Sequence, residues 1–258
     1  MNISRLFDLT GRKALVTGAG RGIGRVIAIA LAEAGCDVSL LGTTMENIEA
    51  VANEIHQLGH KGIAIQTDVS KKEQVDKAFL QTAEQLGRLD ICVNNAGVSM
   101  RKSHRAAEEM KEEDWDRIMD INLKGVFLCA QAAAWIMIPQ KQGSIINIAS
   151  MSAITVNIPQ KQAAYNTSKA GVAMLTKALA VEWAQYGIRV NSICPGYIKT
   201  DMILSKMTPL FSLWESLTPL GRLGNPEELS GAAIYLASEA SSFMTGHNMV
   251  VDGGYTAR

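Results

Sequence analysis

The chain has 258 residues, of which 47% are hydrophobic and 19% are charged, and its 25 basic side chains balance 25 acidic ones. These values are typical of a folded globular protein and exclude an intrinsically disordered chain. The zero formal net charge gives no indication of binding to nucleic acid or to an anionic membrane surface. The length suits one α/β domain or at most two small ones.

The cysteines and the amino-terminal residues indicate the cellular setting. Cys36, Cys92, Cys129 and Cys194 are scattered and form no C-x-x-C pair, so we expect neither a structural zinc site nor a disulfide framework. The amino-terminal sequence lacks the apolar core of a signal peptide, and no run of about 18 apolar residues is present. We therefore expect a cytoplasmic protein that does not span a membrane.

The first predicted strand leads directly into a glycine-rich turn. Residues Lys13 to Thr17 are followed by G-A-G-R-G-I-G and then by an apolar helix that ends near Gly35. Glycines let backbone N–H groups approach a pyrophosphate, and the start of the helix adds positive potential. The spacing of Gly18, Gly22 and Gly24 therefore predicts a dinucleotide site.

The second predicted strand, Asp37 to Leu41, indicates which dinucleotide binds. In folds that bind NAD this strand usually ends in an acidic residue that holds the ribose 2′-hydroxyl. Here Gly42 and Thr43 follow, and the nearest acid, Glu46, lies in the next helix. We therefore favour NADP(H), with NAD(H) as the alternative. Arg21 could pair with the 2′-phosphate and Thr43 could hydrogen-bond it, unless Arg21 is only a solvated charge.

Helices and strands alternate through the middle of the chain. A helix over Glu46–Gln57, a strand over Gly62–Thr67, a helix over Lys71–Leu86 and a strand over Leu89–Val93 are expected. Asp68 and Val69 follow the third strand, and Asn94 to Gly97 (N-N-A-G) follow the fourth. Such a turn after a buried strand suits either a ligand site or an ordinary Asn-Gly turn.

A long helix is predicted over Met110–Met137, with Asn122 on its apolar face. A buried Asn usually satisfies its amide within the protein, and a role in proton relay is the alternative. The fifth strand, Gly143 to Ala149, is followed by Ser150 and Ser152. Active sites of parallel sheets collect at this edge.

The sequence A-Y-N-T-S-K-A places Tyr165 four residues before Lys169. On a helix, here predicted to run to about Tyr186, these side chains share one face. A neighbouring ammonium group favours the phenolate and lowers the pKa of the tyrosine. The pair is therefore expected to exchange a proton with an alcohol or carbonyl oxygen near neutral pH.

The rest of the chain completes the alternation. A sixth strand over Ile188–Ile193, a helix from Pro226 to about Ala237 and a seventh strand over His247–Val251 are expected. Between them, residues 200–217 are rich in Met, Leu and aromatic side chains, including Met202, Met207, Phe211 and Trp214. This segment suits a substrate lid or ordinary packing. The alternation predicts an α/β protein with a parallel sheet covered on both faces.

Taken together, T-G-x-x-x-G-x-G, N-N-A-G, a helix Asn, a serine at a strand end and Y-x-x-x-K occur in an order that resembles the short-chain dehydrogenase/reductase family. The resemblance covers nearly the whole chain. It implies a Rossmann-type, doubly wound, seven-stranded parallel sheet in a single domain over residues 1–258. It also implies a nicotinamide cofactor, a small-molecule substrate, no catalytic metal and a homotetramer.

The resemblance also implies roles for single residues. Tyr165 would be the acid/base, Lys169 would lower its pKa and hold the nicotinamide ribose, and Asn122 would anchor a water relay. The family serine commonly lies thirteen residues before the tyrosine, which is Ser152, but Ser150 directly follows the strand. We assign Ser150 and keep Ser152 as the alternative.

Cofactor contacts are implied in the same way. The resemblance places the pyrophosphate, ribose, adenine and nicotinamide against residues from five turns of the chain and from the helix of Tyr165. These residues are Gly18, Arg21, Gly22, Ile23, Gly24, Thr43, Asp68, Val69, Asn95, Ala96, Gly97, Tyr165, Lys169, Pro195, Gly196, Ile198 and Thr200.

The sequence around Tyr165 and the stretch L-W-E-S-L-T-P-L-G-R-L-G look like those of polyol, sugar and carbonyl dehydrogenases, such as galactitol, mannitol and gluconate dehydrogenases. We expect hydride transfer between nicotinamide and a secondary alcohol or ketone. A 3-oxoacyl-carrier-protein reductase shares the motifs and would need a basic patch, for which Arg101, Lys102 and Arg105 are candidates. A non-catalytic dinucleotide-binding regulatory protein is the second alternative.

Overall fold

The computed structural model describes residues 3–99, 106–204 and 208–257. Its centre is one sheet of seven parallel strands in the order β3-β2-β1-β4-β5-β6-β7. The order reverses between β1 and β4, which leaves a crevice at the carboxyl ends of these strands. The strands are β1 (Lys13–Thr17), β2 (Asp37–Gly42), β3 (Gly62–Gln66), β4 (Ile91–Asn94), β5 (Gly143–Ile148), β6 (Ile188–Pro195) and β7 (Asn248–Val251).

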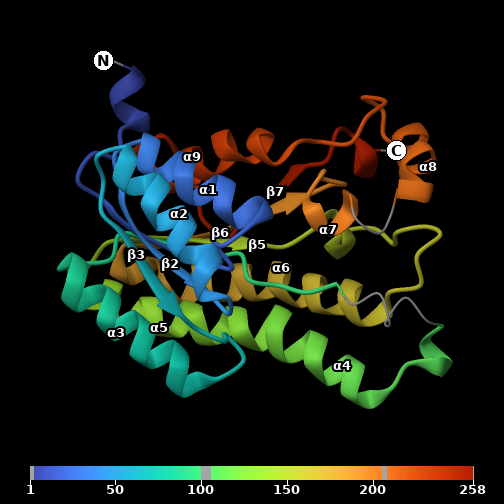
Figure 1. Cartoon of the computed structure of the whole chain (residues 1–258), viewed down its shortest axis with the longest axis horizontal. Helices are drawn as coiled ribbons and strands as arrows, with labels where there is room; N and C mark the ends of the chain where they lie inside the picture. Colours follow the sequence, from blue (N-terminus) through green and yellow to red (C-terminus); the bar gives the residue numbers. More distant parts are fainter. Residues whose placement is uncertain (1–2, 100–105, 205–207, 258) are drawn as a thin grey trace.

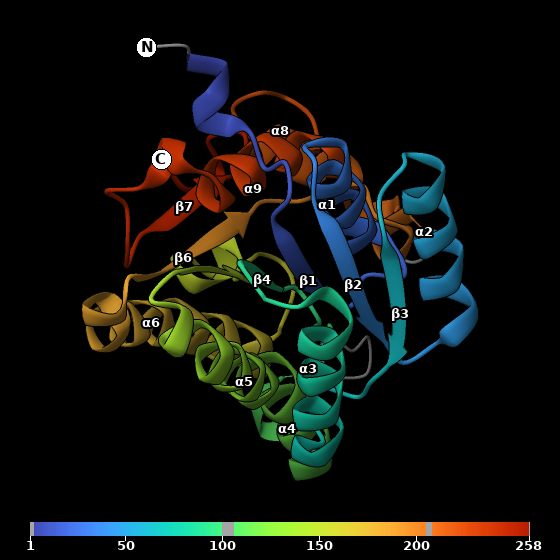
Figure 2. The same ribbon diagram turned by 90° about the vertical axis from the view of Figure 1, so that its left-hand side faces the viewer.

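Helices cover both faces of the sheet (Figures 1 and 2). One face carries α1 (Gly22–Glu33), α2 (Met45–Gln57) and α9 (Ser230–Ala237), and the other carries α3 (Lys72–Leu86), α5 (Gly125–Gln140) and α6 (Ala163–Trp183). The expected doubly wound, Rossmann-type architecture is confirmed. Two short helices, α7 (Asp201–Leu204) and α8 (Phe211–Leu217), lie beside the carboxyl edge.

Alternation of side chains along the strands builds the two cores. Val16 and Leu40 face the core under α1 and α2, whereas Leu15 and Leu41 face the core under α3 and α5. All four side chains are fully buried. Neighbouring residues of a strand point to opposite faces, so a strand covered on both sides is apolar throughout. This explains why the strands read as continuous apolar runs in the sequence.

Most predicted boundaries lie within two residues of those observed. Gly87, which directly follows α3, has φ of 80° in the left-handed region, where glycine carries no steric penalty. At the start of the last helix, residues Pro226–Leu229 form a 3₁₀ turn before α9 begins at Ser230.

The single helix predicted over Met110–Met137 is wrong in one respect. The chain forms α4 (Glu112–Met119), a π-helical turn (Asp120–Lys124) and then α5. The π turn contains Asn122, whose amide bonds the backbone of Val98. We attribute the extra residue of this π turn to the bonds between Asn122 and Val98. The apolar periodicity of the sequence does not indicate such a turn.

The combined helix, Glu112–Gln140, is long and apolar enough to cross a membrane by length and composition alone. More than half of its most apolar window is buried within the protein. It packs against α3 and α6, as a core helix of this fold does. Its apolar character is therefore accounted for by the core beneath the sheet.

Candidate active site

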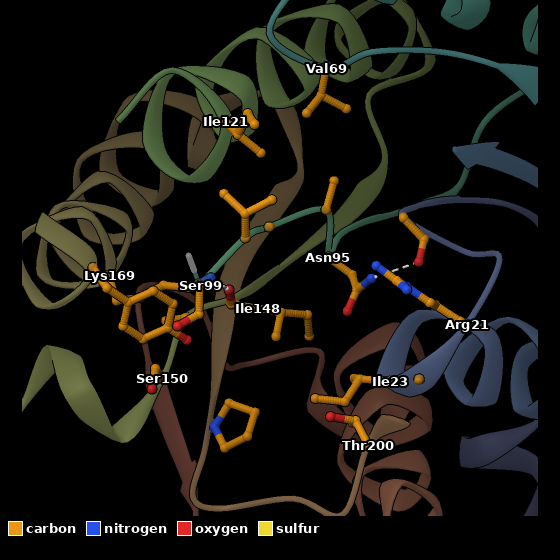
Figure 3. A pocket seen from close by; sticks show the side chains of 18 of the residues that line it. Arg21, Ile23, Val69, Asn95, Ser99, Ile121, Ile148, Ser150, Lys169 and Thr200 are labelled. Carbon is orange, nitrogen blue, oxygen red and sulfur yellow. Dashed lines mark hydrogen bonds between the residues drawn. The ribbon is translucent and has the colours of Figure 1, made fainter. Parts of the chain in front are cut away.

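A cavity of about 1090 Å³ lies along the carboxyl ends of the strands. Ser150 and Lys169 stand at one end, Arg21 and Thr200 stand at the other, and Asn95 lies between them (Figure 3). The structure places all the predicted site residues in the lining of this cavity except Gly24 and Asn122. A long cavity with the chemistry at one end and a glycine turn at the other has the shape that a dinucleotide requires.

The glycine turn and the N-N-A-G sequence are joined by side chains. Thr17 Oγ accepts from the backbone N–H groups of Asn95 and Ala96 at 3.0 and 2.9 Å. In return, Asn95 Nδ2 donates to the carbonyl oxygens of Thr17 and Gly18 at 2.9 and 3.1 Å. Thr17 was not predicted as a site residue. These four bonds hold the carboxyl ends of β1 and β4 together on either side of the crevice.

The glycines of the turn fit a cofactor that approaches the backbone closely. Gly18 and Gly22 have φ of 62° and 56°, which other residues rarely adopt. A Cβ at Gly24 would collide with the side-chain nitrogen of Asn95 and the carbonyl oxygen of Gly18. Gly24 therefore lies behind the cavity wall and allows α1 to begin directly against the turn. The backbone and the helix start leave room for a pyrophosphate at this end.

The far end of the cavity is open and polar. Arg21 and Thr43 are both exposed there. The Asp68 carboxylate accepts from the backbone and the hydroxyl of Ser70 at 2.9 and 2.8 Å, so this acid is fixed in a turn after β3. Asn47 and Lys71 also line the cavity, although no motif in the sequence selects them.

Lys169 is held by the main chain of β5. Its Nζ donates to the Ile148 carbonyl oxygen at 2.7 Å, and the side chain is only 4% exposed. Burial lowers the pKa of Lys169 to about 8, because desolvation disfavours the ammonium form. A Cβ at Gly97 would lie 3.6 Å from this nitrogen, so the absence of a side chain there keeps the cavity open beside the lysine.

The expected lowering of the Tyr165 pKa by Lys169 is not found. The pKa of Tyr165 lies above its ordinary value because burial disfavours the phenolate, and a hydrogen bond with Ser150 acts in the opposite direction. The Lys169 nitrogen lies 5.8 Å from the centre of the tyrosine ring. At this position its bond goes to Ile148 and not to the phenol oxygen.

The buried side-chain amide of Asn122 is hydrogen-bonded within the protein, as a buried amide usually is. Its Oδ1 accepts from the Val98 N–H at 2.8 Å, and its Nδ2 donates to the Val98 carbonyl at 2.9 Å and to Ser168 Oγ at 3.2 Å. Ser168 in turn donates to the Tyr165 carbonyl oxygen. The side chain thus ties the residue that follows N-N-A-G to α6.

Ser150 and Ser152, considered above as alternatives, are hydrogen-bonded to each other. Ser150 Oγ donates to Ser152 Oγ at 3.0 Å, and the Ser152 N–H donates to Ser150 Oγ at 3.1 Å. Both side chains are buried and line the cavity. Of these two serines, it is Ser150 that shares a side-chain hydrogen bond with Tyr165, as expected of the serine that follows β5 directly.

Sequence reasoning missed one wall of the cavity. Asn157, Gln160 and Gln162 line it between Ser152 and Tyr165. The oxygen of the Gln160 amide accepts from Trp214 Nε1 at 3.2 Å, and its nitrogen donates to the Ile158 carbonyl at 3.0 Å. The available signal was three uncharged amides within a six-residue stretch just before the tyrosine helix.

Trp214 of the segment 200–217 packs as a core residue. It is 1% exposed, and its ring stacks on Tyr197 with centroids 4.0 Å apart. Tyr197 also meets Tyr255 edge to face. Of the two alternatives for this segment, a substrate lid or ordinary packing, Trp214 fits ordinary packing, although it also lines the cavity. Met207 lies outside the described residues.

A second set of amides ties together the elements behind the site. Asn94 Nδ2 donates to Asn147 Oδ1 at 2.9 Å, and Asn147 Nδ2 donates to Thr176 Oγ at 2.9 Å. All three side chains are fully or almost fully buried. The chain of bonds crosses from β4 to β5 to α6, the three elements that lead to Asn95, Ser150 and Tyr165.

Comparison with known proteins agrees with this geometry. Residues 18–256 match the profile of a family described as enoyl-(acyl carrier protein) reductase. A sorbose reductase of Candida albicans is 42% identical over 99% of this chain and 90% of its own length. A galactitol 2-dehydrogenase of Rhizobium johnstonii is 41% identical over 99% of both chains.

A solved short-chain type dehydrogenase/reductase from Mycobacterium marinum has 47% identity, full coverage of both chains and a TM-score of 0.96. The chain belongs to the short-chain dehydrogenase/reductase family. Membership makes it an oxidoreductase that uses a dinucleotide cofactor, as the motifs implied. Within this short-chain dehydrogenase, Lys169 and Ser150 lie at the end of the cavity opposite Arg21 of the glycine turn. Tyr165 lies with them, because it bonds Ser150 and its ring faces the Lys169 nitrogen.

Proposed function

We propose that this short-chain dehydrogenase interconverts a secondary alcohol and a ketone on a polyol, a sugar or a small carbonyl compound, with NADP(H) as the preferred cofactor. The observation that carries the proposal is the position of Tyr165 beside Ser150 and Lys169, at one end of a cavity that has the glycine turn at its other end. The bound cofactor would accept or donate a hydride at C4 of the nicotinamide.

Each residue has a defined part in the reaction. Tyr165 gives a proton to the carbonyl oxygen in reduction and takes it from the hydroxyl in oxidation. Ser150 donates a hydrogen bond to the same oxygen and so stabilises the charge that develops on it. Lys169 supplies positive charge and holds the cofactor ribose, and Asn122 contributes through the π turn that contains it. No metal is needed, because the tyrosine and the serine provide the electrophilic assistance.

The remaining assigned residues hold the cofactor. Gly18, Gly22 and Ile23 receive the pyrophosphate, and Gly24 lets α1 begin directly behind them. Asp68 and Val69 contact the adenine. Asn95, Ala96 and Gly97 lie on the ribose side. The nicotinamide ring and its carboxamide contact Pro195, Gly196, Ile198 and Thr200, which line the cavity.

The preference for NADP(H) rests on the end of β2. Thr43 stands where an acid would repel a 2′-phosphate, and the exposed Arg21 lies at the same end of the cavity. Among the relatives, a probable mannitol dehydrogenase is described as NADP-dependent, and a glycerol dehydrogenase is described as NAD-dependent. A solved gluconate 5-dehydrogenase from Burkholderia cenocepacia contains NADP. Both cofactors therefore belong in the assay.

The polar wall of the cavity supports a polyhydroxylated substrate over an acyl carrier protein. Asn157, Gln160 and Gln162 offer amide groups that suit hydroxyls. The cavity rim at α4 carries Glu113 and Asp114, which an acidic carrier would meet unfavourably. The basic candidates Arg101, Lys102 and Arg105 lie outside the described residues.

A carrier-protein reductase of Synechocystis is 40% identical over 95% of this chain, so identity alone does not separate the two activities. The sorbose reductase and the galactitol dehydrogenase match at slightly higher identity over longer stretches. A regulatory protein without activity would have no need of the assembled Ser150, Tyr165 and Lys169.

A cytoplasmic homotetramer is part of the proposal. Large apolar side chains are exposed along the helices on one face: Trp135 and Phe127 on α5, and Met174 and Val181 on α6 are between 39% and 81% exposed. Apolar surface of this kind marks protein contacts. We also assign residues 200–217 as a segment that closes over substrate around the fixed Trp214.

The test is an absorbance assay of the purified protein with polyols, sugar acids, ketoses and simple ketones, using NADP(H) and NAD(H) in turn. Turnover of a polyol or ketose, faster with NADP(H), is expected. Turnover of an acyl-carrier-protein thioester alone would refute the substrate class. No turnover of any substrate would refute the enzymatic function.

A further inference from the structure

Ser150 begins a chain of hydrogen bonds that runs along the cavity wall. Its hydroxyl donates to Ser152 Oγ at 3.0 Å, and the Ser152 hydroxyl donates to Asn157 Oδ1 at 2.5 Å. Gln162 Nε2 donates to the same Asn157 oxygen at 2.8 Å. All four side chains are less than 9% exposed, so protein groups and not bulk solvent determine where each hydrogen points.

The amides give this chain a direction. Both hydrogens of Gln162 Nε2 are used, one on Asn157 Oδ1 and one on Asn166 Oδ1 at 3.0 Å. Asn157 Nδ2 donates to the Tyr197 hydroxyl at 3.2 Å. Asn157 therefore presents only an acceptor to Ser152, and the Ser152 hydrogen is committed to it. Towards the cavity and Ser150, Ser152 can act only as an acceptor.

Catalysis disturbs this arrangement at one point. To polarise the reacting oxygen, Ser150 must turn its hydrogen away from Ser152 and towards the substrate. Ser152 then loses its donor in a buried position, and an unsatisfied buried acceptor is costly. A hydroxyl on the substrate carbon next to the reacting one can replace that donor. Oxygens on adjacent carbons are separated by about the same distance as hydrogen-bonded hydroxyl oxygens.

We propose that Gln162 is a positioning residue that, through Asn157, keeps Ser152 an acceptor, and that Ser152 thereby selects vicinal diols and α-hydroxy ketones as substrates. The proposal rests on the proposed function and specifies its substrate class. Sites built to bind a hydroxyl discriminate strongly against analogues that lack it, because the site's own polar group is left unpaired.

The wild-type enzyme gives the first test through a matched pair of ketones, hydroxyacetone and acetone, and through the preferred ketose paired with its analogue that lacks the adjacent hydroxyl. We expect kcat/KM to be higher by about tenfold or more for the hydroxylated member of each pair. Equal values within each pair would overturn this inference alone. Failure to turn over any compound would overturn the proposed function, and this inference with it.

Variants give the second test. Ser152→Ala should lower kcat/KM for hydroxyacetone and leave that for acetone nearly unchanged, which reduces the ratio at least about fivefold. Gln162→Glu should have a similar effect on the ratio, because its carboxylate would face the Asn157 oxygen and turn the Asn157 amide nitrogen towards Ser152. Gln162→Met removes the anchor without adding charge and should give a smaller reduction in the same direction.

The matched control is Gln160→Met, which removes a neighbouring amide that bonds Trp214, Ile158 and the Tyr197 hydroxyl and has no bond to Ser152, Asn157 or Gln162. It should leave the ratio unchanged whatever it does to absolute rates. If Gln162 had only a structural role, its substitution would lower kcat/KM for both ketones by the same factor. An unchanged ratio in active Ser152→Ala and Gln162→Glu enzymes would overturn the inference.

Discussion

The ammonium nitrogen of Lys169 lies 5.8 Å from the centre of the Tyr165 ring, and its hydrogen bond goes to the carbonyl oxygen of Ile148. The lysine is therefore positioned by strand β5, independently of the tyrosine. Burial is the main cause of the pKa shift of both side chains: it raises the pKa of the phenol and lowers that of the ammonium group. Each residue is held in its uncharged form more strongly than in water.

Replacing Tyr165 by Phe removes a single hydroxyl. Because that hydroxyl carries the proton to and from substrate, we expect kcat to fall by at least about 100-fold. Cofactor affinity and the unfolding midpoint should stay close to wild type. Steady-state kinetics and cofactor fluorescence titration measure these effects. Tyr186→Phe, at a partly exposed position after α6, is the control and should be fully active. Residual activity near wild type in Tyr165→Phe would contradict the assignment.

Lys169 should make stability depend on pH in the alkaline range. Burial lowers the pKa of Lys169 from 10.5, the ordinary value of an exposed lysine, to about 8 in the folded protein. Between these values the unfolded chain binds a proton that the folded chain does not, so the free energy of unfolding rises with pH. From pH 8 to 10.5 the wild type should gain roughly 2 to 3 kcal/mol relative to Lys169→Met. Urea denaturation of both proteins across this range measures the difference, and parallel curves would show that the lysine is not desolvated.

Thr43→Asp should change cofactor preference. The new carboxylate at the end of β2 would repel a 2′-phosphate and could bind the ribose hydroxyls of NAD(H). We expect the ratio of kcat/KM for NADPH over NADH to fall by at least about tenfold. Thr43→Asn is the matched control, because asparagine has the size of aspartate without its charge. If the aspartate variant keeps the wild-type ratio, the adenosine ribose does not lie beside residue 43.

Gly24→Ala tests the packing behind the glycine turn. The added methyl group would collide with Asn95 and with the Gly18 carbonyl, and α1 would have to move away from the turn. Overpacking of this kind typically costs about 1–3 kcal/mol, and we expect weaker cofactor binding as well. Thermal unfolding with and without NADPH measures both effects. Gly231→Ala is the control, since no atom lies within 4 Å of its added Cβ.

The sequence predicts well those features that depend on local pattern. Apolar runs and helical periodicity located the seven strands and the covering helices, and the glycine turn was identified because backbone freedom restricts its residues. The π turn at Asn122 could not be predicted, because it depends on a bond to Val98, which is 24 residues away. The pKa of Tyr165 was misjudged because spacing along a helix does not report burial or competing partners such as Ile148.

The cavity wall formed by Asn157 and Gln162 could not be predicted for a similar reason. An amide in a loop is as often solvated as buried, and only the folded chain shows that these amides meet Ser152 and Tyr197. The choice between Ser150 and Ser152 was framed as exclusive, whereas the two hydroxyls bond each other. Sequence spacing identifies candidates for a role, and three-dimensional contacts show which of them act together.

The buried bonds between Asn94, Asn147 and Thr176 have a consequence for native-state dynamics. Since they join two central strands to the helix of Tyr165, local opening of any one of these elements would leave polar groups of the others without partners. Native-state hydrogen exchange should therefore show the three elements opening as one cooperative unit, later than the surface helices around them. Partial unfolding that disturbs the reacting groups should accordingly be rare while the surrounding loops fluctuate.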